Sequence, residues 1–204
     1  MTMLARQRPV RFGVIGLGVG SVAAFAGPNS PMTFFEIDPE METIARRYFT
    51  FLERCGRNCN VVIGDGRLEL SRMPNGHFNL LMLDAFSSDA IPTHLLSREA
   101  VQLYLEKLTP DGIILFHVSN RYLDVTRLVA TLVKDVPLVG YIRRDVKPVV
   151  DDSKLSSIYI AAARRVGDLG SLTSMREWEP ITPPASFPVW TDDYSNLLSI
   201  VKLR

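Results

Sequence analysis

The chain contains few residues of the kinds that bind metals or build disulfide frameworks. Its 204 residues include two cysteines and three histidines. Cys55 and Cys59 are four positions apart, and no histidine lies near them in the sequence to complete a zinc site. Because disulfides are rare in the cytosol, we expect two free thiols and no metal.

The sequence also lacks an excess of charge, a long hydrophobic run and a secretory leader. Its 23 basic and 22 acidic residues give a net charge of +1, which provides no electrostatic footprint for nucleic acid. No apolar run approaches the roughly 20 residues that span a bilayer, so we expect no direct membrane insertion. Residues 1–9 contain two arginines but no apolar signal-peptide segment, which indicates a cytoplasmic protein.

What the sequence does contain is a regular alternation of strand and helix patterns. Hydrophobic residues make up 47% of the chain, enough for a substantial core. The expected strands are Val10–Ile15, Met32–Ile37, Asn60–Ile63, Phe78–Leu83, Ile113–Val118, Leu138–Ile142 and Ser157–Ala163. The expected helices begin near Ser21, Glu40, Arg67, Arg98 and Leu123, and the second runs to about Leu52. Five βα units followed by a hairpin-like pair predict an α/β fold with a doubly wound, mostly parallel sheet.

The same patterns divide the chain into three parts. Residues 1–9 are a tail, residues 10–166 form the α/β domain, and residues 167–204 are a proline-rich C-terminal extension. We expect the extension to pack on or near the edge of the sheet that carries the site. Its tryptophans, Trp178 and Trp190, would then cover the sheet or contact a second subunit of a homodimer.

A glycine-rich turn, Gly16-Leu17-Gly18-Val19-Gly20, follows the first expected strand. Glycine permits positive φ angles and lets a ligand approach the backbone closely. No lysine accompanies the glycines, which excludes a P-loop, and the spacing GxGxG departs from the dinucleotide fingerprint. No basic residue is placed there for a pyrophosphate. A nucleoside without phosphates, such as S-adenosylmethionine or a relative, therefore fits best.

Acidic residues end the strands that follow. Glu36 lies twenty residues after Gly16, where a carboxylate can accept hydrogen bonds from both hydroxyls of a ribose. Asp65 lies between two glycines and could accept one from an adenine amino group, and Asp84 ends the fourth strand. Ligands of doubly wound sheets bind at these carboxyl ends, so we expect one shared site. The alternative is that Glu36 is a solvated strand end and Asp65 a turn former.

Two of the three histidines follow or end a strand near the same edge. His117 ends the fifth strand and is either a proton carrier or a hydrogen-bonded structural histidine. His94, in the loop after Asp84, could line the site or serve only in the loop.

Several motifs resemble the spermidine synthase (polyamine aminopropyltransferase) family. They are the glycine turn, Glu36-Ile37-Asp38, Gly64-Asp65-Gly66, the run from Leu83 to Pro92, the run from Phe116 to Tyr122, and Thr191-Asp192-Asp193-Tyr194. The resemblance covers about Phe12 to Tyr194. It implies a Rossmann-like fold of the class I methyltransferase type with seven strands. It also implies decarboxylated S-adenosylmethionine as donor and a diamine as acceptor.

The resemblance further implies a role for each matching residue. Gly16, Gly18 and Gly20 would surround the sulfonium end of the donor, Glu36 would hold its ribose, and Asp65 with Gly66 its adenine. Asp84 would accept the proton of the attacking amine. The candidates for binding the small-molecule amine are Ser87, Asp89, Asp192, Asp193 and Tyr194. For Asp192 and Asp193, a solvated turn or a helix cap is the alternative.

Three departures from the family leave other functions open. Val19 stands where those enzymes typically have an acidic residue that helps to bind the aminopropyl ammonium, which favours S-adenosylmethionine and a small-molecule methyltransferase. The loop after Asp84 is longer, so Asp89 does not align without a gap. The first core strand begins near Val10, so we expect the N-terminal β-hairpin domain to be missing. A third hypothesis is a non-catalytic nucleoside-binding module.

Overall fold

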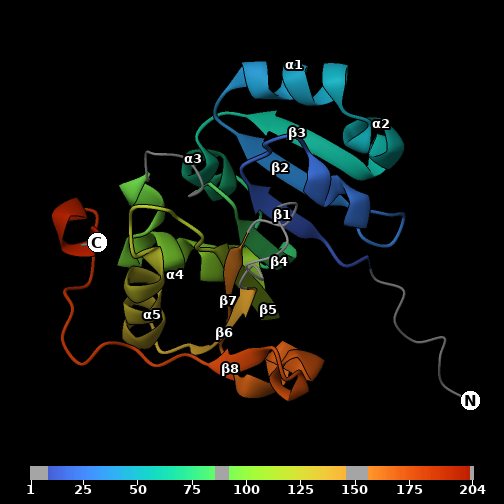
Figure 1. Ribbon diagram of the computed structural model, residues 1–204. Helices are drawn as coiled ribbons and strands as arrows, with labels where there is room; N and C mark the ends of the chain where they lie inside the picture. Colours follow the sequence, from blue (N-terminus) through green and yellow to red (C-terminus); the bar gives the residue numbers. More distant parts are fainter. Residues whose placement is uncertain (1–8, 86–91, 146–155, 203–204) are drawn as a thin grey trace, which may run out of the picture.

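The computed structural model describes residues 9–85, 92–145 and 156–202, and Ser87 and Asp89 lie outside these ranges. Eight strands form one sheet in the order β3-β2-β1-β4-β5-β7-β6-β8 (Figure 1). Their bounds are β1 Phe12–Ile15, β2 Met32–Glu36, β3 Cys59–Ile63, β4 Phe78–Leu83, β5 Leu108–His117, β6 Val139–Asp145, β7 Ser157–Ala163 and β8 Trp178–Pro180. The expected α/β sheet is confirmed.

Strand direction divides the sheet into two parts. Strands β1 to β5 run parallel to one another, whereas β7 pairs antiparallel with both β5 and β6. The eighth strand, β8, adds antiparallel to β6 and comes from the C-terminal extension. The expected number of seven strands was therefore one too few, because the short Trp178–Pro180 segment carries no alternating pattern that would predict a strand.

Neighbouring residues of the central strands point into two different cores. In β1, β2 and β4, the residues Val14, Phe34 and Met82 belong to one buried cluster. Their neighbours Ile15, Phe35 and Leu83 belong to the other cluster. Alternation of side chains along a strand produces this division, and burial on both faces explains why these strands are nearly continuous hydrophobic runs.

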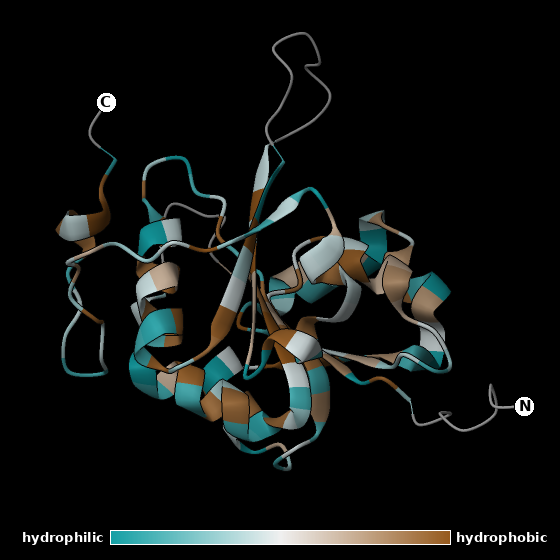
Figure 2. Ribbon diagram, turned by 90° about the horizontal axis from the view of Figure 1, so that it is seen from below, coloured by the Kyte–Doolittle hydropathy of each residue, from teal (hydrophilic) through white to brown (hydrophobic). Residues whose placement is uncertain are grey.

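Helices cover both faces of the sheet. Helices α1 (Pro39–Tyr48) and α2 (Phe51–Cys55) lie together beside β2 and β3 in Figure 1, and their buried residues join the cluster of Val14. Helices α3 (Gly66–Ser71), α4 (Arg98–Lys107) and α5 (Val125–Asp135) pack on the opposite face. In Figure 2 the helices show a hydrophobic and a hydrophilic side, as expected for helices that cover a sheet.

Two expected helices are shorter than the sequence pattern indicated. The glycine turn leads into η1 (Ser21–Phe25), a five-residue 3-10 helix and not an α-helix. The expected helix from Glu40 to about Leu52 is divided, because Phe49 adopts an extended conformation (φ −131°, ψ 154°) between α1 and α2. The remaining 3-10 segments are η2 (Gly56–Asn58), η3 (Thr93–Leu95), η4 (Val166–Ser174) and η5 (Leu197–Ile200).

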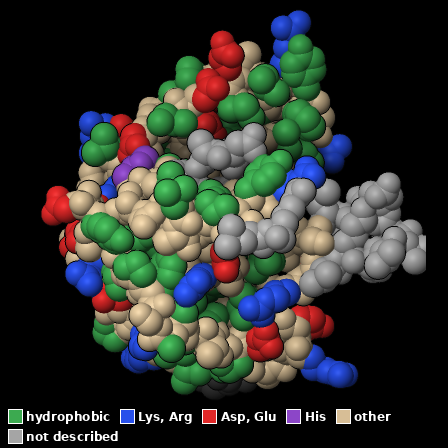
Figure 3. Space-filling view, turned by 60° about the vertical axis from the view of Figure 1, so that its left-hand side comes forward, with side chains coloured by type: hydrophobic (Ala, Val, Ile, Leu, Met, Phe, Trp, Pro, Cys, Tyr) green, Lys and Arg blue, Asp and Glu red, His purple; other side chains and the backbone are tan. Residues whose placement is uncertain are grey.

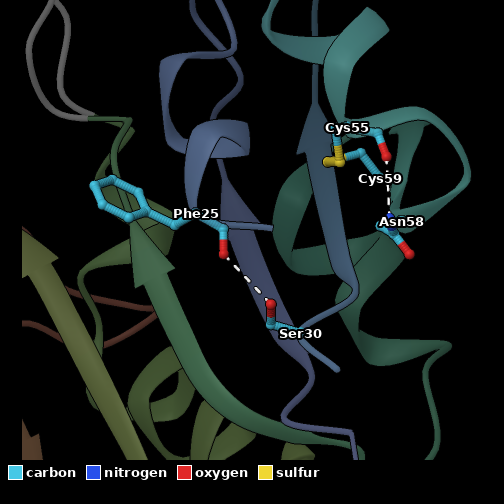
Figure 4. The surroundings of a disulfide bond; sticks show 5 residues. All are labelled: Phe25, Ser30, Cys55, Asn58 and Cys59. Atoms are coloured by element: carbon cyan, nitrogen blue, oxygen red, sulfur yellow. Dashed lines mark hydrogen bonds between the residues drawn. A yellow bond between two sulfur atoms is a disulfide. The ribbon is translucent and has the colours of Figure 1, made fainter. Parts of the chain in front are cut away.

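The two cysteines form a disulfide, which corrects the expectation of free thiols. Cys55, the last residue of α2, is bonded to Cys59, the first residue of β3 (Figure 4). The side-chain amide of Asn58 donates a hydrogen bond to the carbonyl of Cys55 inside the same loop. A spacing of four residues did not reveal this pairing, because it depends on a tight reversal of the chain (Cα–Cα 5.7 Å) that only the fold creates.

The described residues include no membrane-spanning helix, and charges of both signs are mixed on the face drawn in Figure 3. Within the described ranges, no helix is both long enough and apolar enough to cross a bilayer. On the face drawn in Figure 3, basic and acidic side chains are interspersed among hydrophobic ones. Groups of three or more histidine, cysteine or acidic side chains suited to a metal are likewise absent from the residues that the structure describes.

Candidate active site

A cavity of about 560 Å³ lies at the carboxyl ends of β1, β2, β3 and β4. Its lining includes six residues singled out from the sequence, namely Gly16, Gly18, Glu36, Asp65, Gly66 and Asp84. The lining also contains Asp38 and His94 as further polar residues, and Ile15, Phe35, Ile37 and Met41 among its apolar ones. The volume is in the range of sites for small molecules and nucleosides.

Parallel pairing brings these strand ends together. Gly16 follows β1 and donates its backbone N–H to the carbonyl of Phe35 in β2 at 2.8 Å. On the other side of β1, Asp84 donates its backbone N–H to the carbonyl of Ile15 at 2.9 Å. The register therefore fixes the glycine turn between the ends of β2 and β4, although Gly16 and Asp84 lie far apart in the sequence.

The glycines of the turn serve different purposes. Gly16 has φ +99°, and a Cβ there would lie 2.7 Å from the carbonyl oxygen of Asp84, so no larger residue fits. Gly18 has φ +53° and faces open space beside the cavity. Gly20 has φ +79° and packs on Leu52 of α2, and it does not line the cavity. Of the three, Gly18 leaves the most room for a ligand.

Glu36 is buried, with 8% of its surface exposed, and both of its carboxylate oxygens are engaged. Oε2 accepts the backbone N–H of Leu17 at 2.8 Å, and Oε1 accepts that of Asp38 at 3.0 Å. These bonds hold the carboxylate in place beneath the glycine turn. Each oxygen keeps further lone-pair capacity, which is what acceptance of ribose hydroxyls requires.

Asp65 is fixed by the helix that it precedes and by a histidine. Its Oδ1 accepts the backbone N–H of Leu68 at 2.9 Å, which caps the N-terminus of α3. Its Oδ2 lies 2.8 Å from Nε2 of His94. Asp65 is therefore a cap and a cavity residue at the same time, and His94 reaches the cavity from the loop after β4.

Two hydrogen bonds to backbone carbonyls hold the loop that carries His94. The Tyr104 hydroxyl in α4 donates to the carbonyl of Leu95 at 2.9 Å. Complete burial raises the pKa of Tyr104, which keeps its hydroxyl protonated and able to donate. Arg67 in α3 donates from Nη1 to the carbonyl of His94 at 2.9 Å. These two contacts position η3 along the cavity wall.

Asp84 pairs with His117 across two neighbouring strands. Oδ1 of Asp84 lies 2.5 Å from Nδ1 of His117 at the end of β5. The imidazole ring stacks on Tyr159 of β7, with ring centroids 4.6 Å apart and an interplanar angle of 18°. Burial and the nearby charge of Asp84 raise the pKa of the Tyr159 phenol, so this ring stays neutral. The Asp84 carboxylate therefore lines the cavity and is held in place by the imidazole of His117.

The cavity lining is acidic. Its described residues include the carboxylates of Glu36, Asp38, Asp65 and Asp84, and neither lysine nor arginine is among them. A second hollow of about 450 Å³ lies between η1 and strands β1, β4 and β5, and no carboxylate is among its described lining residues. The acidic cavity is therefore the better match for a positively charged ligand.

Comparison with known proteins finds relatives among transferases. No protein-family model matches the chain. The chain is 35% identical over 128 residues to a polyamine aminopropyltransferase of Vibrio vulnificus, which covers 59% of this chain and 42% of that protein. The spermidine synthase of Thermotoga maritima shares the fold, with a TM-score of 0.61 over 97% of this chain and 66% of that one, at 14% identity. The chain thus resembles a polyamine aminopropyltransferase in part of its sequence and has a fold of the class I methyltransferase type, which it shares with spermidine synthases.

A second curated relative of the chain is named as a methyltransferase homolog. An eEF1A lysine and N-terminal methyltransferase homolog of Drosophila pseudoobscura pseudoobscura is 31% identical over 138 residues, covering 62% of this chain and 20% of that protein. The chain thus spans less than half the length of these two curated relatives. Both relatives are named as transferases, and the names differ in the group that is transferred.

The C-terminal extension reaches α3 and not the cavity itself. Asp192 accepts two hydrogen bonds from Arg67, Nη1–Oδ1 and Nη2–Oδ2, each 2.7 Å long. The Ser97 hydroxyl donates to Oδ1 of Asp192 at 2.6 Å. The Arg67 guanidinium lowers the pKa of Asp192 to about 2, and Ser97 adds to this effect. Asp192 is thus an ion-pair partner of Arg67.

The structure brings together only part of the residues predicted to bind the amine. Asp192, Asp193 and Tyr194 do not line the cavity, and Asp193 and Tyr194 are exposed. Ser87 and Asp89 lie outside the described residues. Trp190 is fully buried in the core that α4 and α5 form on the sheet, so it packs within its own chain. Of the two roles expected for Trp190, the structure thus shows packing on the sheet, whereas position in a proline-rich tail gave no signal for the Arg67–Asp192 contact.

Sequence reasoning left three contributions to the site unassigned. They are the Asp65–His94 pair, the Tyr104 hydroxyl below η3 and the Arg67–Asp192 pair. Each joins side chains that are far apart in the sequence or belong to an irregular loop. A helix-cap pattern at Asp65 and an apolar α4 pattern around Tyr104 were readable, but their partners were not.

Proposed function

We propose that the chain binds an adenosyl sulfonium compound in the acidic cavity and transfers its aminopropyl group to an amine. The observation that supports this most strongly is the shared cavity that joins Gly18, Glu36, Asp65 and Asp84. In this proposal the ribose hydroxyls donate to Glu36, and the adenine lies beside Asp65 and Gly66. The sulfonium end lies between Gly18 and Asp84.

In this proposal, Asp84 prepares the acceptor. A protonated amine cannot attack, and a carboxylate beside it both attracts the cation and accepts its proton. The freed nitrogen then attacks the carbon bonded to sulfur, the C–S bond breaks, and its electron pair stays on the sulfur of methylthioadenosine. The positive charge moves from sulfur to nitrogen. Since the sulfonium carbon is already activated, the protein contributes mainly alignment of the two reactants.

The charge of the cavity favours the decarboxylated donor. This donor carries an ammonium and a sulfonium without a carboxylate, whereas S-adenosylmethionine adds one negative charge. A like charge about 6 Å from a carboxylate costs roughly 2–3 kcal/mol at an effective dielectric constant of about 20. Val19 stands in the glycine turn where the family typically has an acidic residue, but four carboxylates remain in the cavity lining. We therefore expect the decarboxylated compound to bind more tightly.

The second candidate is a small-molecule methyltransferase on the same fold. Val19 at the glycine turn and the methyltransferase relative support it. In that case S-adenosylmethionine binds more tightly than its decarboxylated form, and the adenosyl product is S-adenosylhomocysteine. Calorimetry with both donors, followed by product analysis with a panel of amines, separates the two candidates.

Replacement of Asp84 tests the catalytic part. We expect Asp84→Asn to lower kcat at saturating donor by about 10²- to 10⁴-fold, because the asparagine keeps the shape but accepts no proton. Loss of the Asp84 charge should also weaken binding of the cationic donor. Asp111→Asn is the matched control, since Asp111 is exposed near the start of β5, away from the strand ends that form the cavity. Donor binding by wild type without any adenosyl product would instead support a non-catalytic nucleoside-binding module.

A further inference from the structure

The proposed function assigns a role to Asp84 but none to His117, the histidine that Asp84 contacts. Only one oxygen of Asp84, Oδ1, contacts the imidazole, through a 2.5 Å hydrogen bond. The side chain of His117 is 18% exposed and that of Asp84 is 30% exposed. Asp84 lines the cavity, whereas His117 is not among its described lining residues.

The surroundings of Nε2, the second ring nitrogen of His117, restrict which nitrogen carries the hydrogen. Nε2 is buried and has no hydrogen-bond partner among the residues that the structure describes. A proton on Nε2 would create a buried N–H donor without an acceptor, which typically costs about 1–3 kcal/mol. A hydrogen on Nδ1, by contrast, is shared with the carboxylate of Asp84. The geometry thus favours a hydrogen on Nδ1 over one on Nε2.

The strands next to β5 keep the ring in this orientation. Tyr159 lies directly opposite His117 in the β5–β7 register and stacks on the imidazole. Arg143 lies opposite Tyr159 in the β6–β7 register and is the next charged group on that side. Asp84, directly after β4, is the charged group on the other side. The ring is held by stacking on one side and by a hydrogen bond on the other.

We propose that His117 is a positioning residue for Asp84: its Nδ1–H binds Oδ1 and leaves Oδ2 free to accept the proton of the amine. This inference rests on the proposed function, because it assigns the task of Asp84 to one oxygen. Loss of the hydrogen bond lets the carboxylate rotate away from the amine. A misplacement of about 1 Å can cost roughly 100-fold in rate.

Two substitutions at His117 test the role of the hydrogen bond. The amide nitrogen of asparagine occupies nearly the position of Nδ1, so His117→Asn keeps a donor that does not titrate. His117→Leu removes the donor and keeps an apolar side chain against Tyr159. We expect kcat to fall roughly 10- to 100-fold in His117→Leu at unchanged KM for the donor, and to stay within a few-fold of wild type in His117→Asn.

Two results would overturn the positioning role of His117. Equal loss of kcat in both variants would overturn the positioning role, since it would mean that a titrating imidazole is needed. Wild-type kcat in His117→Leu would overturn it as well. Circular dichroism and thermal melting of both variants establish that they fold.

A second measurement does not depend on turnover. Nitrogen-15 NMR of the histidine rings should show the Nδ1–H tautomer for His117 in wild type, and Asp84→Ala should abolish that preference. Observation of the Nε2–H tautomer in wild type would overturn the inference even if the enzyme is active. Conversely, absence of any transferase product with the Nδ1–H tautomer present would refute the proposed function and leave the pairing intact.

Discussion

Gly18 provides a direct test of where the donor lies. Its φ of +53° is in the left-handed region, and no atom lies within 4 Å of the position that a Cβ would occupy. Gly18→Ala is therefore accommodated sterically, and its cost to the fold is that of a left-handed alanine, about 1 kcal/mol. The added methyl group points into open space at the cavity. A misplaced methyl-sized group in a binding site changes affinity by about 1–3 kcal/mol, or 10- to 200-fold.

Gly76 is the matched control for this substitution. It has φ +64°, a Cβ added there would also meet no atom within 4 Å, and it lies in the turn before β4, away from the strand ends that line the cavity. We expect Gly18→Ala and Gly76→Ala to lower the free energy of urea unfolding equally, by about 1 kcal/mol. Only Gly18→Ala should weaken donor binding in calorimetry. Wild-type affinity in Gly18→Ala would refute the placement of the donor against the glycine turn.

Further predictions concern the contacts around the cavity. Glu36→Gln should destabilise the fold by about 1–3 kcal/mol in urea unfolding and weaken the donor, because one of two backbone N–H groups loses its acceptor. The pKa of Asp192 is about 2 in the fold and 3.8 without its partners, so its contribution is complete above about pH 4 and is lost as the pH falls toward 2. Asp192→Asn should therefore cost about 1 kcal/mol in unfolding experiments at pH 7, since the pair is partly solvated, and less at pH 3; an equal cost at both values would contradict this. Reductant should lower wild-type stability by about 2 kcal/mol, the value for a five-residue loop, and leave the double variant Cys55→Ser/Cys59→Ser unchanged.

The sequence predicted the strand ends of the site because their chemistry is local. Glycines after β1 and the acidic residues Glu36, Asp65 and Asp84 follow hydrophobic runs, and parallel pairing brings such ends to one edge. Helix lengths were less predictable. The break at Phe49 and the short η1 lie within patterns that would also suit longer helices. There, packing of η1 against α2, and of Leu52 against Gly20, accompanies the shorter elements.

Side-chain partners could not be predicted, because they join elements that the sheet order brings together. Asp84 and His117 are 33 positions apart, yet β4 and β5 are adjacent strands, Asp84 directly follows β4, and His117 ends β5. Arg67 and Asp192 are 125 positions apart and meet only because the extension returns to α3 and α4. The disulfide is similar, since its formation requires the reversal between α2 and β3.

These partners explain how distant parts of the chain bear on one cavity. Arg67 follows Gly66 directly and donates both to Asp192 in the extension and to the carbonyl of His94. His94 in turn contacts Asp65, which lines the cavity beside Gly66. Each link is a charge-assisted hydrogen bond, the kind with the strongest geometric preference. The extension therefore positions the wall on the adenine side in the proposed function, whereas His117 positions the carboxylate on the amine side. Donor affinity and turnover should accordingly respond to different substitutions, which makes the two halves of the proposal separable by experiment.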